Sequence, residues 1–277
     1  MTDLWRDLLD CLDLRESPTN TTGGDDDAKA PLVLTGRNQR LGYHRLFGGQ
    51  LLAQFARAAT LACPDKTVKS LHALFPRAGR TDEPVRYEVE RRHEGSTFAT
   101  VTITAAQTAG VVATASVSLH TVEKGLDLQS TAPVPAVPGE DRRVELEPLP
   151  WETRSVVELD TAAAEVAEYD FWMRTPSADP DLAPALTAYA SDLTLIGTAL
   201  RPIEAVVQRD SGTAFTSAVT AHTVWFHRPF RTDEWLHLRQ HSPLVAHGRC
   251  FGRGDVLTAG GSLVASYAQE ALLRFRT

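Results

Sequence analysis

The chain has little cysteine and no surplus of basic charge. Its three cysteines, Cys11, Cys63 and Cys250, are odd in number and widely spaced over 277 residues, which argues against a disulfide framework or a zinc site. The formal net charge is −7 and the basic residues are scattered. The chain therefore lacks the electrostatic footprint of a nucleic-acid-binding protein.

Long apolar runs and targeting signals are also missing. No stretch is long enough to cross a bilayer, and the opening segment MTDLWRDLLDCLDL carries acidic residues where a signal peptide has basic ones. Apolar residues make up 43% of the chain and charged residues 23%, a composition typical of globular proteins. We expect a cytoplasmic enzyme or binding protein with no membrane partner.

Two stretches have the composition of loops or linkers. Residues 121–150 are rich in proline and charge and have no apolar period, which indicates a linker. The segment SPTNTTGGDDDAKA at 17–30 predicts a surface loop. We therefore divide the chain into an N-terminal unit at 1–120, a linker at 121–150 and a C-terminal unit at 151–277.

The two units share an internal repeat. RTDEPVRYEV begins at Arg80 and RTDEWLHLRQ at Arg231, an offset of 151; TAGVVATAS begins at Thr108 and TAGGSLVAS at Thr258, an offset of 150. Chance explains one such match more readily than two in register. The repeat therefore predicts that one structural unit has been duplicated.

Each unit is predicted to contain one long apolar helix and a run of antiparallel strands. In the first unit, GGQLLAQFARAATLAC at 48–63 has a helical apolar face, and VRYEVERRH at 85–93 alternates with the period of a half-buried strand. In the second, TAYASDLTLIGTAL at 187–200 predicts one helix, and LVAHGRCFGRGDVLT at 244–258 is among the predicted strands. These elements indicate an α+β fold in which a sheet curls around its helix.

Asp192 is the unusual residue of the second helix. It is the only charged residue between Asp181 and Arg201, in a helix that is apolar almost all the way round. Burying a carboxylate there costs several kcal/mol unless it is paired or put to use. A structural, salt-bridged acid is the other interpretation, whereas a helix N-cap is disfavoured by the mid-helix position.

Several motifs together resemble the acyl-CoA thioesterase II family. The likeness runs from about Gly36 to Arg274, with all blocks in family order. The motifs that carry it are RLFGGQLLAQFARAA, SLHALFPRAGRTDEPVRYEVERRHEGSTF, YASDLTLIGTAL, VWFHRPFRTDEWL and GSLVASYAQEALLR.

The resemblance implies a double-hotdog fold, in which two tandem units each wrap an antiparallel sheet around a long central helix. It also implies hydrolysis of acyl-CoA to a free fatty acid and coenzyme A, with no metal, cofactor or covalent intermediate. Asp192 falls on the family's catalytic aspartate and Gln269 on its catalytic glutamine. The position of the family's hydroxyl residue is held by Val219, and that of the usual acidic residue by Ala221.

This departure leaves the hydroxyl of the site to be assigned. Thr220 points to the opposite sheet face if its strand is regular, but a β-bulge would turn it inward. Ser217 and Thr223 share the parity of Val219 in the strand and are other candidates. We therefore predict Asp192, Gln269 and Thr220 as the catalytic residues. Losing one hydrogen bond to the water costs on the order of 1–3 kcal/mol, so activity is expected to be reduced.

Substrate binding is assigned to Gly48, Gly49 and Gln50 at the start of the first helix. Their backbone N–H groups lie at the positive end of the helix dipole, where a substrate oxygen can approach closely. A glycine pair is equally compatible with a simple tight turn. The histidines His222 and His227 have no acidic or cysteine partner at metal spacing, so we interpret them as structural.

Three functions are weighed. The leading one is an acyl-CoA thioesterase with acyl-CoA as its partner, and a homo-oligomer is left open. The second, motivated by Val219 and Ala221, is a weak or inactive homologue that binds acyl-CoA or a protein. The third is enoyl-CoA hydration, which ranks last because YASDLTLIG lacks the histidine of a hydratase motif.

Overall fold

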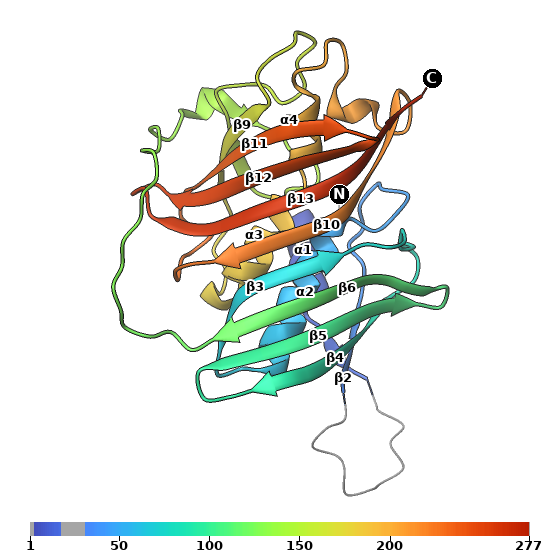
Figure 1. Cartoon of the computed structure of the whole chain (residues 1–277), viewed down its shortest axis with the longest axis vertical. Coiled ribbons are helices and arrows are strands. Elements are labelled where there is room, and N and C mark those ends of the chain that lie inside the picture. Colours follow the sequence, from blue (N-terminus) through green and yellow to red (C-terminus); the bar gives the residue numbers. More distant parts are fainter. Residues whose placement is uncertain (1–2, 18–30, 277) are drawn as a thin grey trace, which may run out of the picture. The chain divides into compact units, whose positions relative to one another are not determined.

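The computed structural model describes residues 3–17 and 31–276, and it divides into two compact units (Figure 1). The N-terminal unit is Met1–Gly125 and the C-terminal unit is Leu126–Thr277. The loop predicted at 17–30 lies outside the described residues, apart from its first residue. Within the described ranges, no helix combines the length and the apolar character needed to span a membrane.

In its described residues, the N-terminal unit is an antiparallel sheet with two helices. Its elements are α1 (Leu4–Leu12), β1 (Arg15–Glu16), β2 (Leu32–Gly36), α2 (Gly48–Ala62), β3 (Thr67–Leu74), β4 (Val85–Glu94), β5 (Phe98–Gln107) and β6 (Gly110–His120). The strands are ordered β1-β2-β4-β5-β6-β3, and neighbours run antiparallel. Helix α2 packs against β3, β4, β5 and β6 (Figure 1).

The C-terminal unit has the same character. Its elements are η2 (Glu140–Arg142), β7 (Arg143–Val144), β8 (Glu152–Arg154), β9 (Glu168–Arg174), η3 (Pro180–Leu182), α3 (Ala183–Ser191), α4 (Leu195–Leu200), η4 (Gln208–Asp210), β10 (Phe215–Phe226), β11 (Leu236–Ala246), β12 (Arg249–Thr258) and β13 (Leu263–Phe275). Its strands are ordered β10-β13-β12-β11-β9-β8-β7, again antiparallel. Helix α4 packs against β9, β11, β12 and β13.

The repeat read from the sequence matches the order of strands in the two units. The orders β2-β4-β5-β6-β3 and β9-β11-β12-β13-β10 follow one pattern, in which the second strand along the chain lies at the far edge, next to the fifth. In each RTDE motif the arginine Nη2 pairs with the aspartate two residues on, at 2.6 Å for Arg80–Asp82 and 2.5 Å for Arg231–Asp233. Both motifs lead into a strand, as duplication predicts.

Two predicted elements of the N-terminal unit are confirmed by their burial. The helix predicted over 48–63 is α2, whose apolar side chains Leu51, Leu52 and Phe55 are buried. The strand predicted over 85–93 is β4, and its alternating apolar side chains are also buried. Each such Leu or Phe contributes roughly 1.5–3 kcal/mol relative to an exposed position.

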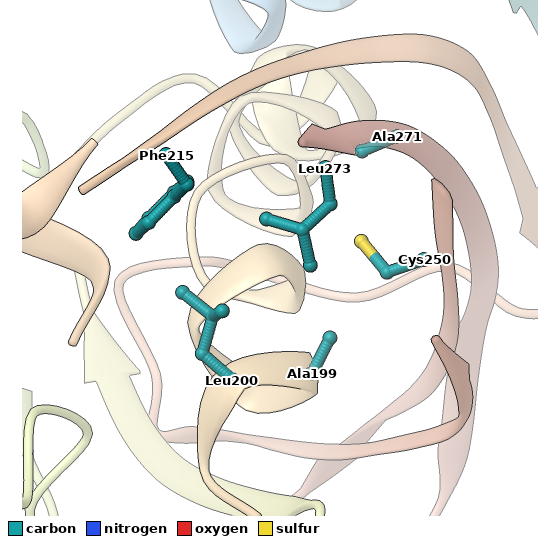
Figure 2. Packing of buried hydrophobic residues seen from close by; sticks show 6 residues of the cluster. All are labelled: Ala199, Leu200, Phe215, Cys250, Ala271 and Leu273. Carbon is teal, nitrogen blue, oxygen red and sulfur yellow. The ribbon is translucent and has the colours of Figure 1, made fainter. Parts of the chain in front are cut away.

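The core of the C-terminal unit lies between α4 and the sheet. Figure 2 shows apolar side chains from α4 facing those of β10, β12 and β13. These residues are Ala199, Leu200, Phe215, Cys250, Ala271 and Leu273, all buried. The short helix α4 is therefore fixed by the sheet rather than by its own six residues, which are too few for a stable isolated helix.

The predicted linker at 121–150 is largely part of the C-terminal unit. The chain divides between Gly125 and Leu126, and residues beyond that point bind the C-terminal sheet. Gln129 Nε2 donates to the Gly261 carbonyl at 2.7 Å and its Oε1 accepts from the Leu263 N–H at 3.0 Å. Hydrogen bonds of this kind hold a segment whose composition alone predicts no packing.

One predicted strand is wrong. The segment at 244–258 was expected to be a single strand, but it is the hairpin that joins β11 to β12. His247 and Gly248 both have positive φ, at 52° and 73°. Two successive residues in this region make the tight turn that matches the twist of paired strands, so the chain reverses there.

Candidate active site

Asp192 lies at a break in the helix predicted over 187–200. Helix α3 ends at Ser191 and α4 begins at Leu195, so Asp192 is the C-cap of α3 rather than a mid-helix residue. The prediction of one continuous helix is wrong. The carboxylate is nevertheless buried as expected, with a side chain only 3% exposed.

Gln208, from the turn η4, holds the break. Its Oε1 accepts a hydrogen bond from the Gly197 N–H at 2.8 Å, and its Nε2 donates to the Leu193 carbonyl at 3.1 Å. Backbone groups released by a helix break need such partners when they are buried. A Cβ at position 197 would collide with this amide oxygen, so glycine is required for the close approach.

A second amide, Gln240 on β11, fixes the first turn of α4. Its Oε1 accepts from the hydroxyls of Thr194 at 2.8 Å and Thr198 at 3.0 Å, and its Nε2 donates to Tyr267 Oη at 2.8 Å. The Tyr267 ring is nearly parallel to the His222 ring, with 6.1 Å between centroids and 12° between planes. The break is thereby connected to the strands that carry the remaining site residues.

Asp192 and Gln269 both meet the imidazole of His222. His222 Nδ1 lies 2.9 Å from Gln269 Oε1 and 3.8 Å from Asp192 Oδ1, and its Nε2 lies 2.9 Å from Ser191 Oγ. His222 and Gln269 face each other directly across β10 and β13. The structure thus brings together two of the predicted catalytic residues and adds a third side chain between them.

Burial controls the charge of this histidine. It lowers the pKa of His222 to about 4, an effect that the hydrogen bond with Gln269 opposes only in part. The imidazole is therefore neutral at neutral pH, with one nitrogen that donates and one that accepts. Both of its nitrogens already have neighbours at hydrogen-bond distance, Ser191 Oγ and Gln269 Oε1.

Gln269 is confirmed as a buried residue rather than a solvent-facing one. Its side chain lies on the inner face of β13 with Ala265 and Tyr267, and the residue is 2% exposed. Among the described residues, its Nε2 has no hydrogen-bond partner. A buried donor left in this state costs about 1–3 kcal/mol of folding free energy, and it is the kind of group that a substrate or its water can use.

The structure does not bring Thr220 to this cluster. The predicted bulge is present, because the pairing of β10 with β13 shifts between Val219 and Ala221. Thr220 Oγ1, however, donates to the carbonyl oxygen of Glu270 at 3.0 Å and lies 3.3 Å from its carboxylate. Glu270 is partly exposed and pairs with Arg249 at 2.9 Å, so Thr220 faces the outer side of the sheet.

The bulge explains why His222 was missed. In a regular strand His222 would share a face with Thr220, opposite Val219. The extra residue reverses the alternation, so His222 points inward with Gln269. A bulge has no reliable sequence signal, and only the register against β13 would have revealed this histidine.

Gly48, Gly49 and Gln50 open α2 as predicted. The N-cap residue Phe47 has a side chain that cannot accept a hydrogen bond, which leaves the first N–H groups uncapped by it. The side-chain amide of Gln50 forms its hydrogen bonds with residues of its own unit. Its Oε1 accepts from the Gln39 N–H at 2.9 Å, and its Nε2 lies 3.0 Å from Asn38 Oδ1 and 3.1 Å from Gln54 Oε1. The Gln50 side chain is therefore engaged within the protein, and the role of this residue in substrate binding stays a prediction.

The cysteines do not offer an alternative nucleophile. All three are buried and free of disulfides. Burial raises the pKa of the Cys11 thiol to about 12 and that of Cys250 to about 11, so neither thiolate forms at neutral pH. In the part of the chain that is described, no group of three or more His, Cys, Asp or Glu side chains is arranged to hold a metal ion.

Comparisons with known proteins cover both units. The sequence model of the acyl-CoA thioesterase N-terminal domain matches residues 36–120, and that of the C-terminal domain matches residues 124–273. Acyl-CoA thioesterase 2 of Haemophilus influenzae is 32% identical over 270 residues, with 88% of this chain and 93% of that protein covered. Human acyl-coenzyme A thioesterase 8 is 28% identical over 277 residues, covering 88% and 85%.

Comparison with solved structures indicates the same family. The acyl-CoA thioesterase II TesB2 of Mycobacterium marinum has a TM-score of 0.78 at 30% identity, over 98% of this chain and 99% of that one. A protein from Alicyclobacillus acidocaldarius described as having a hot dog fold has a TM-score of 0.72 at 19% identity, with 98% of each chain covered. The chain has the hotdog fold of these neighbours, belongs to the acyl-CoA thioesterase family and is a thioester hydrolase.

Proposed function

We propose that this chain hydrolyses acyl-CoA thioesters to a free fatty acid and coenzyme A at a site built from Asp192 and Gln269. The names of its relatives support this substrate class. The single observation that carries the site is the buried amide donor of Gln269, next to the histidine that Asp192 also contacts.

The reaction needs a base, a nucleophile and a donor. Water attacks the thioester carbonyl carbon while Asp192 accepts one of its protons, which is general-base catalysis. Gln269 Nε2 donates a hydrogen bond that orients this water. The carbon–sulfur bond then breaks, and the coenzyme A thiolate takes up the proton held by Asp192, which restores the carboxylate. The enzyme forms no covalent bond to the acyl group.

A finer feature of the fold belongs to the same proposal. We assign the double-hotdog arrangement, in which each unit's sheet wraps around its helix, with α2 and the α3–α4 pair in the central positions. The assignment of the Gly48 and Gly49 N–H groups to a substrate oxygen concerns the N-terminal unit alone and stays a prediction. The uncapped start of α2 supports that assignment, because helix N-termini favour developing negative charge.

The experiment measures thiol release by the purified full chain on acyl-CoAs from acetyl-CoA to palmitoyl-CoA. We expect turnover on at least one substrate, and a loss of about 10²- to 10⁴-fold in kcat for Asp192→Asn. The matched control is Asp170→Asn, because Asp170 Oδ2 also lies near a buried histidine, 3.6 Å from His237 Nε2. No thiol release by the wild type, or equal losses in the two variants, would overturn the proposal.

A second candidate is an acyl-CoA-binding homologue with weak turnover. The observation that favours it is that Val219 has replaced the family hydroxyl while Thr220 is engaged with Glu270. Calorimetric titration with a non-hydrolysable acyl-CoA thioether separates the two. Tight binding to a chain that shows no turnover on any acyl-CoA would favour this candidate.

A further inference from the structure

His222 connects the end of α3 to the middle of β13. Its side chain has no exposed area, and each ring nitrogen has one neighbour at hydrogen-bond distance. Nδ1 faces Gln269 Oε1 and Nε2 faces Ser191 Oγ, both at 2.9 Å. Because both ring nitrogens are engaged, the imidazole limits the orientations that the Gln269 and Ser191 side chains can adopt.

The position of its single proton follows from these neighbours. Asp192 Oδ1 lies 3.8 Å from Nδ1, and its negative charge favours a proton on that nitrogen. The Nδ1–H then donates to Gln269 Oε1. The opposite tautomer would set the Nδ1 lone pair against an amide oxygen and a carboxylate oxygen, which is repulsive. The Ser191 hydroxyl has a second acceptor, the Ala188 carbonyl at 2.9 Å. In the Nδ1–H tautomer its single proton turns from that carbonyl to Nε2.

The orientation of the Gln269 amide depends on this proton. An amide can rotate by half a turn and exchange its oxygen and nitrogen, and the hydrogen-bond network decides which orientation holds. A proton on Nδ1 is compatible only with the amide orientation in which Oε1 faces the ring. Nε2 then points the other way, where it has no acceptor among the described residues.

We propose that His222 is a positioning residue, whose Nδ1–H locks the Gln269 amide so that Nε2 is the donor presented to the substrate water. This inference rests on the proposed function. It assigns His222 no proton transfer, and Asp192 remains the base. Without the lock, both amide orientations are populated, and one of them presents an oxygen to a water that needs a donor.

Three variants separate positioning from packing. His222→Phe keeps a ring of similar size and removes both nitrogens. His222→Asn places an amide nitrogen near the position of Nδ1 and retains the bond to Gln269, whereas His222→Gln places its polar group near Nε2 and serves Ser191 instead. We expect kcat to fall about tenfold in the Phe and Gln variants, less than for loss of the donor itself. KM should change little, and Asn should restore most of kcat.

His237→Phe is the matched control. His237 is also buried, lies 3.6 Å from an aspartate and packs beside the Trp172 ring at 4.7 Å between centroids. Its replacement should lower the unfolding temperature without lowering kcat. Equal kcat in the wild type and folded His222→Phe, or better rescue by Gln than by Asn, would overturn the inference.

A spectroscopic readout does not depend on turnover. The ¹⁵N chemical shifts of the His222 ring distinguish the two neutral tautomers, and we expect the Nδ1–H form from about pH 5 to 8, since the pKa of this ring is about 4. An Nε2–H tautomer would contradict the inference even in an active enzyme. Absence of wild-type turnover would instead count against the proposed function. The tautomer would still test whether His222 fixes the orientation of the Gln269 amide.

Discussion

Gln54 in α2 and Gln269 in β13 are both buried amides, and they differ in how many of their hydrogen bonds the protein completes. All four hydrogen-bonding positions of Gln54 are used within its own unit. Its Nε2 donates to the carbonyls of Cys11 and Arg37, and its Oε1 accepts from Gln50 Nε2 and Tyr87 Oη. Gln269 has His222 at its Oε1 and, in the described part of the chain, no partner at its Nε2.

Under the proposed function, this difference distinguishes a structural polar network from a catalytic one. A saturated amide recovers the cost of its burial through protein partners alone. An incompletely bonded amide lowers folding stability, and its retention is explained when a ligand completes the set. The N-terminal network therefore stabilises the fold, whereas the C-terminal network leaves one donor unpaired among the described residues, which is the donor that the proposed function uses.

For the two amides compared, the largest predicted effect is the loss of activity in Gln269→Leu. Removing one preorganised donor typically costs about 10²- to 10³-fold in kcat. The free energy of unfolding should fall by about 1 kcal/mol, less than in Gln54→Leu. The variant removes a buried donor that had no protein acceptor, although it also leaves His222 Nδ1 without its bond to Gln269 Oε1. Urea unfolding and thiol-release kinetics on the same preparation check both values. A stability loss without a kcat loss would reverse the comparison.

The opposite outcome is predicted for Gln54→Leu. This variant leaves without a partner the four groups that form hydrogen bonds with the Gln54 amide in the wild type. The free energy of unfolding should therefore fall by about 3 kcal/mol. The activity of the molecules that remain folded should change little. Tyr87→Phe is the milder companion, because it removes only the 2.6 Å bond from Oη to Gln54 Oε1, and we expect a loss of about 1 kcal/mol. A kcat loss in a folded Tyr87→Phe would show that this network also serves catalysis.

Much of the fold was predictable because it depends on local patterns. The alternation in β4 and the apolar face of α2 follow from side chains close together in sequence, and both are confirmed. The break at Asp192 was not predictable, since it depends on Gln208, sixteen residues later, completing backbone bonds that helix periodicity takes as internal.

The candidate site likewise has residues that the sequence predicted and residues that it could not predict. Asp192 and Gln269 were predicted from a family likeness, whereas Thr220 was predicted from a bulge whose direction the sequence does not specify. The bulge is present, yet it turns His222 inward and leaves the Thr220 hydroxyl with Glu270. Which side chain a bulge presents is decided by pairing with the neighbouring strand, which lies fifty residues away in sequence.

A smaller change in activity than in Gln269→Leu is predicted for Val219→Thr, and it is a gain. Val219 pairs with Ala271, two residues along β13 from Gln269, so it lies on the same inner face as that amide. A hydroxyl there would add one hydrogen bond to the attacking water. We expect kcat to rise about tenfold, equivalent to roughly 1.4 kcal/mol. Thr220→Val, measured beside it, should leave kcat unchanged, and a large loss there would return Thr220 to the site.

The most direct test of the central claim is a double-mutant cycle in kcat/KM. It compares Asp192→Asn, Gln269→Leu and the double variant on one acyl-CoA substrate. If both side chains act on one water, their effects are not additive. The account predicts that the double variant is within a few fold of Asp192→Asn alone. Losses that multiply would show that the two residues act independently and would contradict a shared catalytic site.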